Sequence, residues 1–126
     1  MDKETIKSFV QNTLGCGCPE EVFQQIACES MKDKDGIVLH KINIGNRLLV
    51  YVYPVTGAGS LQELIPRIVG IGKEERDRSG FNRFRLVLAA DDREAIQKVA
   101  EELFTGIHND DRVHLHILSK KTIPKF

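Results

Sequence analysis

Residues 37–53 read IVLHKINIGNRLLVYVY, and this stretch decides the fold. It contains two segments, 37–44 and 47–53, that are rich in the β-branched, aliphatic and aromatic residues typical of strands. The dipeptide Gly45-Asn46 between them favours the two-residue turn that joins antiparallel strands. The stretch therefore predicts a β-hairpin, and the other elements are placed relative to it.

Two helices are expected before the hairpin. Apolar residues at steps of three and four predict the first one, namely Ile6, Phe9, Val10 and Leu14. Gly15 suits the left-handed position that ends a helix. Pro19 followed by two glutamates suits the first turn of a second helix over residues 19–28. Its apolar positions are Val22, Phe23 and Ile26. We expect the two helices to form a helical hairpin with a short joint.

The third helix follows the hairpin, in SLQELIPRIVGIG at residues 60–72. Ser60 and Glu63 have the spacing of a capping box. Pro66 lies too deep in this segment for an ordinary helix, because it lacks the N–H that the helix would bond. The segment therefore predicts either a kinked helix or a single turn before a helix that starts near Ile65.

The remaining elements alternate between strand and helix. FRLVLAA at residues 84–90 and VHLHILS at 113–119 predict strands. Between them, Asp91 and Glu94 match a second capping box, and the amphipathic helix that follows ends near Gly106.

The predicted order is α-α-β-β-α-β-α-β, in one domain spanning residues 1–126. Strands that are joined through a helix are normally parallel, whereas the hairpin strands are antiparallel. We therefore expect an α/β fold of the α+β-like kind, with a mixed four-stranded sheet and helices packed on it.

Composition and charge narrow the classes of function. Hydrophobic residues make up 41% and charged residues 29% of the chain, as in globular domains. The 18 basic and 18 acidic residues cancel, so no overall field favours nucleic acid or anionic lipid. The charged N-terminus lacks the apolar core of a secretory signal, and no apolar run approaches the roughly 20 residues of a membrane span. We expect a cytoplasmic protein without a membrane or nucleic-acid partner.

The number and positions of the cysteines suggest a reactive or metal-binding site. Three cysteines, Cys16, Cys18 and Cys28, are an odd number, which argues against a disulfide framework and for free thiols, a metal site or redox use. Cys18 stands where a helix N-cap belongs, so its thiolate would accept backbone N–H groups and feel the helix dipole. Against this, Glu20 and Glu21 favour the neutral thiol, and no histidine or arginine lies within several residues.

A soft metal such as zinc is one interpretation of these thiols. If residues 19–28 are one helix, Cys28 lies roughly 15 Å from Cys18, too far to share a metal with it. Two Cys16-Gly17-Cys18 loops in a symmetric dimer would supply four thiolates instead. The alternative is that both cysteines only pack in a tight corner, since free cysteine is often buried.

Two further candidate sites are weaker. Gly57, Gly59 and Ser60 lie between a strand and a helix, where phosphate-binding loops occur, but the third glycine of the dinucleotide fingerprint is replaced by Gln62. An ordinary turn is therefore the favoured interpretation.

The histidines form the other weak candidate. His114 and His116 point to one face of the last strand, about 6.6 Å apart, and His40 is the candidate third zinc ligand. The favoured interpretation is a solvated sheet face.

Three functions remain open. The leading hypothesis is a thiol site that binds a soft metal or exchanges thiols, with Cys18 as the more activated thiolate and Cys16 as its partner. The alternative is a non-catalytic interaction or regulatory module that self-associates and whose cysteines are packed. A third is a phosphate-ligand binder at Gly57–Ser60. No motif in the sequence assigns an enzyme activity.

Overall fold

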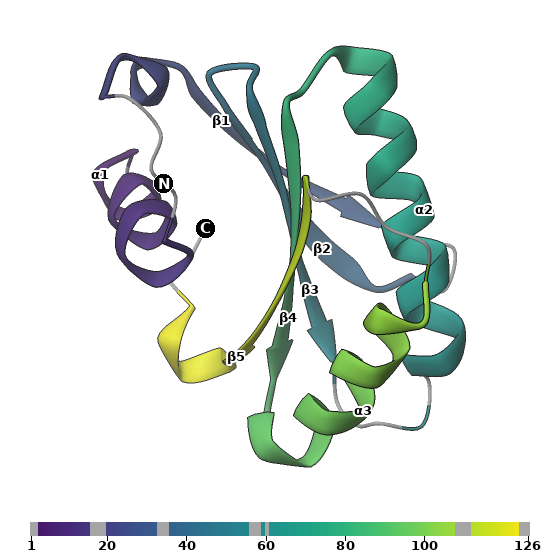
Figure 1. Cartoon of the computed structure of the whole chain (residues 1–126). Coiled ribbons are helices and arrows are strands. Elements are labelled where there is room, and N and C mark those ends of the chain that lie inside the picture. The colour runs from purple at the N-terminus through teal and green to yellow at the C-terminus, as the bar shows by residue number, and fades with distance from the viewer. Residues whose placement is uncertain are drawn as a thin grey trace.

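The computed structural model describes residues 3–15, 20–32, 36–55, 59, 61–107 and 112–123. Within these residues, five strands form one sheet in the order β1-β2-β3-β4-β5 (Figure 1). They are β1 Ile26–Lys32, β2 Val38–Ile44, β3 Leu48–Val55, β4 Arg83–Ala90 and β5 Val113–Ser119. The first three strands are antiparallel neighbours, and β3, β4 and β5 run parallel. The predicted class is confirmed, but the sheet has five strands rather than four.

The hairpin prediction is confirmed at the turn between β2 and β3. Gly45 and Asn46 both have positive φ, 58° and 59°, as a tight hairpin turn requires. The loop has three residues, 45–47, rather than the predicted two, because Ile44 lies opposite Leu48. The Asn43 side-chain oxygen accepts a hydrogen bond from the Asn46 backbone N–H at 2.8 Å and holds the turn closed. A Cβ atom at Gly45 would lie 2.5 Å from the Val22 carbonyl oxygen. The position therefore needs glycine both for its positive φ and for this close approach.

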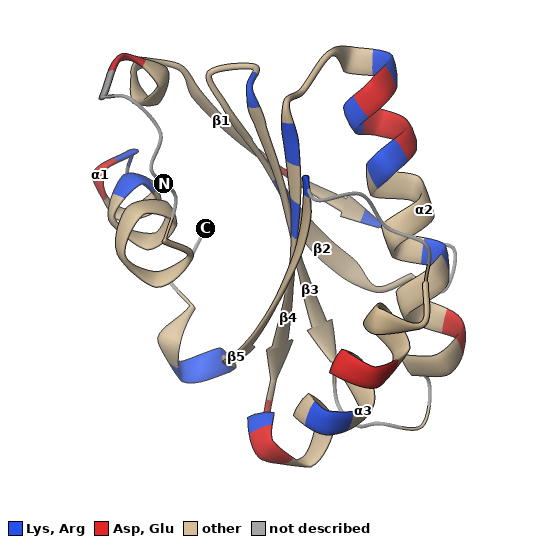
Figure 2. Cartoon of the chain, viewed as in Figure 1, with Lys and Arg blue, Asp and Glu red and all other residues tan. Residues whose placement is uncertain are grey.

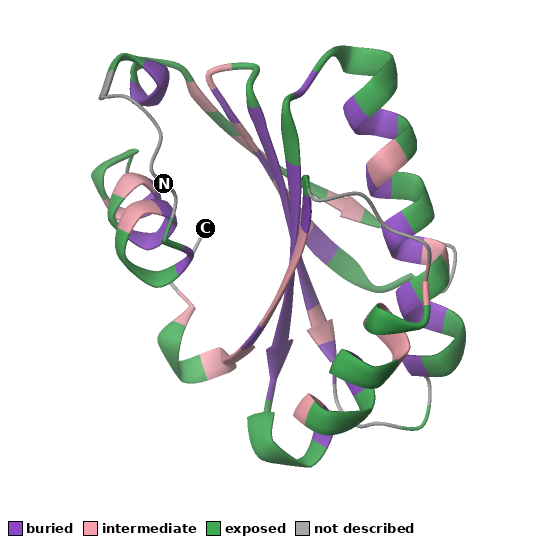
Figure 3. Cartoon of the chain, viewed as in Figure 1, coloured by how far each residue is buried: buried purple, intermediate pink, exposed green. Residues whose placement is uncertain are grey.

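Helices cover both faces of the sheet (Figures 1 and 3). On one face lie α2 Leu61–Ser79 and α3 Arg93–Thr105, packed on Leu49, Tyr51 and Tyr53 of β3. On the other lie α1 Lys3–Ser8, the π-helical turn η1 Phe9–Thr13 and the 3-10 turn η2 Glu20–Gln24, packed on Leu48, Val50 and Val52. Every residue of β3 except Pro54 is buried, so β3 forms part of two cores.

The predicted second helix is wrong. The sequence predicts this helix over residues 19–28, but of the described residues 20–28 only η2 is helical, and β1 begins at Ile26. This strand pairs with β2 along its whole length, from Ile26 opposite Ile44 to Lys32 opposite Val38. Hydrogen bonds to the free edge of the hairpin outweigh the local helical pattern, because strand pairing satisfies backbone groups on both strands. This additional strand is the fifth strand of the sheet.

Two helix boundaries also differ from expectation. Helix α2 continues through Pro66 to Ser79, well beyond residue 72. Pro66 and Gln62 are both exposed, so water can solvate the Gln62 carbonyl that the proline leaves unbonded. The N-cap of α3 is Asp92 rather than Asp91, and its side chain accepts a hydrogen bond from the Ala95 N–H. Among the helices of the described ranges, none has the length and apolar character that crossing a membrane requires.

Two glycines in α2 predict opposite effects of the same substitution. A Cβ atom at Gly72 would lie 2.1 Å from the buried Phe84 ring, whereas one at Gly70 would point into open space. We expect Gly70→Ala to raise the free energy of unfolding by about 0.5–1 kcal/mol through helix propensity. Gly72→Ala should lower it by about 1–3 kcal/mol, because the core is overpacked. Urea unfolding measures both, and equal effects would contradict the packing of α2 on β4.

Candidate functional site

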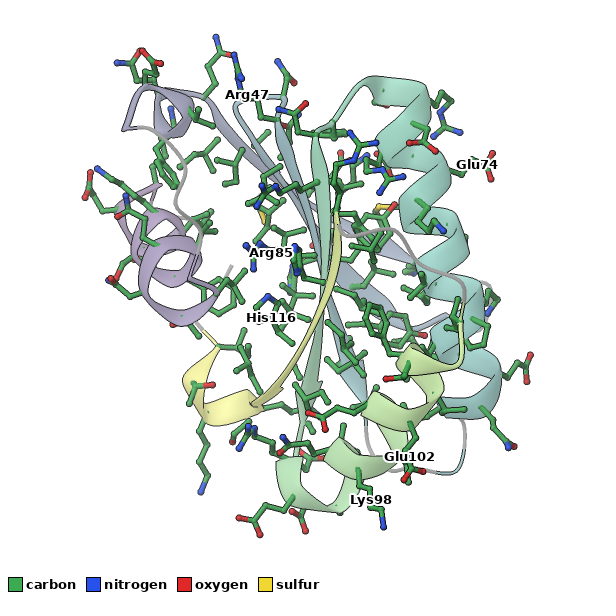
Figure 4. The ribbon with its side chains drawn as sticks, viewed as in Figure 1. Arg47, Glu74, Arg85, Lys98, Glu102 and His116 are labelled. Atoms are coloured by element: carbon green, nitrogen blue, oxygen red, sulfur yellow. The ribbon has the colours of Figure 1, made fainter. Side chains whose placement is uncertain are left out.

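Arg85 is a buried cation on the face of the sheet that the N-terminal helices cover. It lies on β4, is only 7% exposed, and shares its face with Val87. Its Nη1 atom donates to the carbonyl oxygen of Leu14 at 2.9 Å and lies 2.8 Å from Nε2 of His116 on β5 (Figure 4). The side chain therefore joins the end of η1 to a strand 71 residues further along the chain.

His116 is neutral at physiological pH. Burial, and then the charges of Arg85 and His114, lower the pKa of His116 to about 4. A neutral imidazole has one donor and one acceptor nitrogen. Because the arginine donates to Nε2, the proton belongs on Nδ1.

The partners of the Arg85 guanidinium are uncharged. Burial and the nearby Arg83 lower the pKa of Arg85, but an arginine remains protonated in proteins. Across the ranges that the structure covers, no carboxylate forms an ion pair with Arg85, and its Nε atom is buried without a hydrogen-bond partner. Buried charges are ordinarily paired. This environment therefore strongly favours a negative charge close to Arg85.

The segment that Arg85 holds leads directly into the cysteine loop. The Leu14 N–H bonds to the Phe9 carbonyl at 3.1 Å, an i to i−5 bond that makes η1 a π-helical turn. Such turns are rare and often occur at functional sites. Gly15 follows with φ of 71°, as expected for a helix stop. Cys16 and Cys18 lie outside the described residues, and Cys16 is two residues after Leu14 in the sequence.

The candidate zinc ligands His40, His114 and His116 are not brought together. His114 and His116 are half-buried on the face that the N-terminal helices cover, rather than solvated. His40 lies on the same row as His116, but Val52 of β3 and Val87 of β4 stand between them. Three strand spacings separate the two by about 14 Å. The described part of the chain contains no group of three metal-ligating side chains.

Cys28 lies on β1, half-buried against the core beneath the N-terminal helices. Burial first, and Glu29 second, raise its pKa. Because β1 replaces the predicted helix, the separation of roughly 15 Å from Cys18 expected along that helix no longer applies. The raised pKa instead makes Cys28 a neutral, packed thiol and a poor metal ligand.

The candidate phosphate loop is largely outside the described residues. Gly57 and Ser60 fall there, and only Gly59, which is exposed, is described. Phosphate binding at this loop therefore stays a prediction.

Sequence reasoning missed Arg85, although one signal was present. Charged residues gather on α2 and at the periphery, whereas the central strands are mostly uncharged (Figure 2). A charged residue inside an apolar strand such as FRLVLAA is unusual and calls for a specific partner. The partner itself, the Leu14 carbonyl, could not be found from the sequence, because it lies so far away along the chain.

Comparison with protein-family models, with curated proteins and with solved structures finds no match for this chain. Function must therefore be inferred from the residues themselves, and among the described ones Arg85 with its neutral partners is the most distinctive arrangement.

The lowered pKa of His116 predicts a pH dependence of stability. The unfolded chain binds this proton near its ordinary pKa of 6.5 and the folded chain only near 4. The stabilisation from neutral His116 is therefore fully present above pH 6.5 and is lost as the pH falls toward 4. His116→Gln, which keeps an acceptor for Arg85, should show a smaller loss in urea unfolding between pH 7 and pH 4.5. An NMR titration that gives His116 an ordinary pKa would contradict this prediction.

Proposed function

We propose that the Cys16-Gly17-Cys18 loop is a thiol-exchange site of a cytoplasmic protein, and that Arg85 is the cation that stabilises its thiolate. Cys16 and Cys18 are the exchanging pair. The predicted advantage of Cys18 as a helix N-cap no longer applies, because only a 3-10 turn, Glu20–Gln24, precedes β1. The observation that carries the proposal is the hydrogen bond from the buried Arg85 to the carbonyl of Leu14, two residues before Cys16. The positive charge of a buried guanidinium is not neutralised by uncharged partners, so it still attracts a nearby anion.

The positive charge of Arg85 would offset the negative charges that disfavour a thiolate in this loop. Glu20 and Glu21 follow the cysteines and favour the neutral form, and no cation is near them in the sequence. If the thiolate lies about 8 Å from Arg85, the charge would favour it by about 2 kcal/mol at an effective dielectric constant of about 20. An effect of that size would lower a thiol pKa by about 1.5 units, into the range of reactive cysteines.

The same charge favours thiol exchange over metal binding. A guanidinium stabilises a thiolate but repels a second cation such as zinc. In exchange, one thiolate attacks a disulfide of the substrate, forms a mixed disulfide and releases one substrate thiolate. The second cysteine then attacks the mixed disulfide, releases the other substrate thiol and leaves the Cys16–Cys18 disulfide. Cysteines two residues apart can bring their Cα atoms within the range that this bond needs.

The test is the pH profile of alkylation by iodoacetamide, followed for each cysteine by mass spectrometry. One loop cysteine should react with a half-maximal rate below pH 8.5, the value for a free thiol. Arg85→Met should raise that midpoint by about one pH unit, because the cation is lost. Arg85→Lys should keep most of the effect, since it retains the charge.

Two controls separate the thiol effect from a general change of charge or fold. Arg78→Met removes an exposed arginine from α2, on the other face of the sheet, and should leave the profile unchanged. Cys28 is the internal reference, since its raised pKa should keep it slow to react in every variant. The same midpoint in wild type and Arg85→Met would refute the role of Arg85.

Metal analysis and association measurements distinguish the other hypotheses. Zinc in anaerobically purified protein, lost in Cys16→Ser/Cys18→Ser, would replace thiol exchange by the metal-bridged dimer. The interaction module would be favoured by a different result. In that case the cysteines are inert, no metal is bound, and the double variant self-associates as the wild type does. Stabilisation by a nucleotide in a thermal-shift screen would favour the phosphate-binding loop.

A further inference from the structure

A second polar site lies on the opposite face of the sheet from Arg85. It is a cavity of about 350 Å³ between the β1–β2 edge and the C-terminal half of α2. Its walls include Glu29, Lys41, Asn46 and Glu75. The volume is that of a pocket for a small molecule. This site is independent of the thiol site proposed above.

A buried network forms the floor of this cavity. Glu75 of α2 is 7% exposed and uses both carboxylate oxygens, one accepting from the Tyr51 hydroxyl and the other paired with Lys41. Burial alone would lower the pKa of Lys41, but its bonds with Glu75 and then Glu29 outweigh this and raise it. Burial and Glu75 also raise the pKa of Tyr51, so the phenol stays protonated. The floor therefore consists of one ammonium, one carboxylate and a neutral phenol.

Glu29 gives the cavity a surplus negative charge. Its side chain is 65% exposed, and its oxygen lies 3.4 Å from the ammonium of Lys41, whose charge Glu75 already balances. The two carboxylates and the one ammonium sum to a charge of −1. The charge of Arg78, which also acts on Tyr51, is balanced by its own ion pair with Glu74. A cation that enters the cavity would therefore be attracted, and Glu29 at the mouth is the carboxylate it would meet.

The other walls indicate an organic cation rather than a metal ion. Phe81, 8% exposed, and Ala27 are apolar parts of the lining. The described ranges hold no group of three metal-ligating side chains. Stability alone does not explain the network, because apolar residues of the same volume often replace a buried ion pair without loss.

We infer that this cavity binds a small aliphatic amine in its protonated form. The ammonium group pairs with Glu29, the neighbouring asparagine side chains offer polar contacts, and the alkyl chain lies against Phe81.

The test is an NMR titration of the full chain with 1-butylamine at pH 7, with 1-butanol as the uncharged analogue. Butylamine should give saturable shifts of the side-chain amides of Asn43 and Asn46, and 1-butanol should not. Glu29→Gln, at an exposed position of an edge strand, should weaken the affinity about fivefold. Glu102→Gln, on α3 (Figure 4), is the matched control and should leave the affinity unchanged.

Three results would overturn the inference. Shifts of equal size with potassium chloride at the same ionic strength would indicate screening only. Equal affinity in Glu29→Gln and wild type would remove the carboxylate from the site. Tighter binding of acetate than of butylamine would show that the cavity selects anions through Lys41. None of these results bears on alkylation of the cysteines, so this inference and the thiol proposal fail separately.

Discussion

The burial of β3 on both faces is the constraint on which the rest of the structure depends. A strand whose alternate side chains are apolar on both sides needs a cover on each side. Helices α2 and α3 supply one cover, and the N-terminal turns supply the other. The N-terminal segment is therefore fixed to the sheet by the hydrophobic core, and the chain that leads to the cysteines is brought to Arg85 as a consequence.

The elements with strong local patterns could be predicted. The hairpin followed from the positive-φ dipeptide Gly45-Asn46, and α3 from an uninterrupted apolar stripe that ends at Gly106. Residues 26–32 could not, because their alternation is short and mixed in polarity. Their conformation comes from the backbone of β2, which offers a complete row of hydrogen-bonding partners. A signal of that kind lies in the partner strand and not in the segment itself.

The candidate site was predictable only in part, for a related reason. The two cysteines and their glycines stand out in the sequence, and so do the two glutamates that oppose a thiolate. The cation that we propose offsets them comes from a distant strand, and its position depends on the parallel pairing of β4 with β5, which places His116 beside it. Sequence spacing identifies a reactive group, but the electrostatic field around it is a property of the fold.

Each face of the sheet carries a buried cation, and the two cations differ in whether their partners are charged. This difference gives the two faces different electrostatic properties. Lys41 is surrounded by carboxylates, so its field is cancelled within a few ångströms and the excess charge of the site is negative. Arg85 is held by a carbonyl and a neutral imidazole, which satisfy hydrogen bonds without cancelling charge. Because the field of Arg85 persists beyond its own partners, it can act on a neighbouring group. This difference is why we propose a thiolate site on the face beneath the N-terminal helices and a cation site on the opposite face.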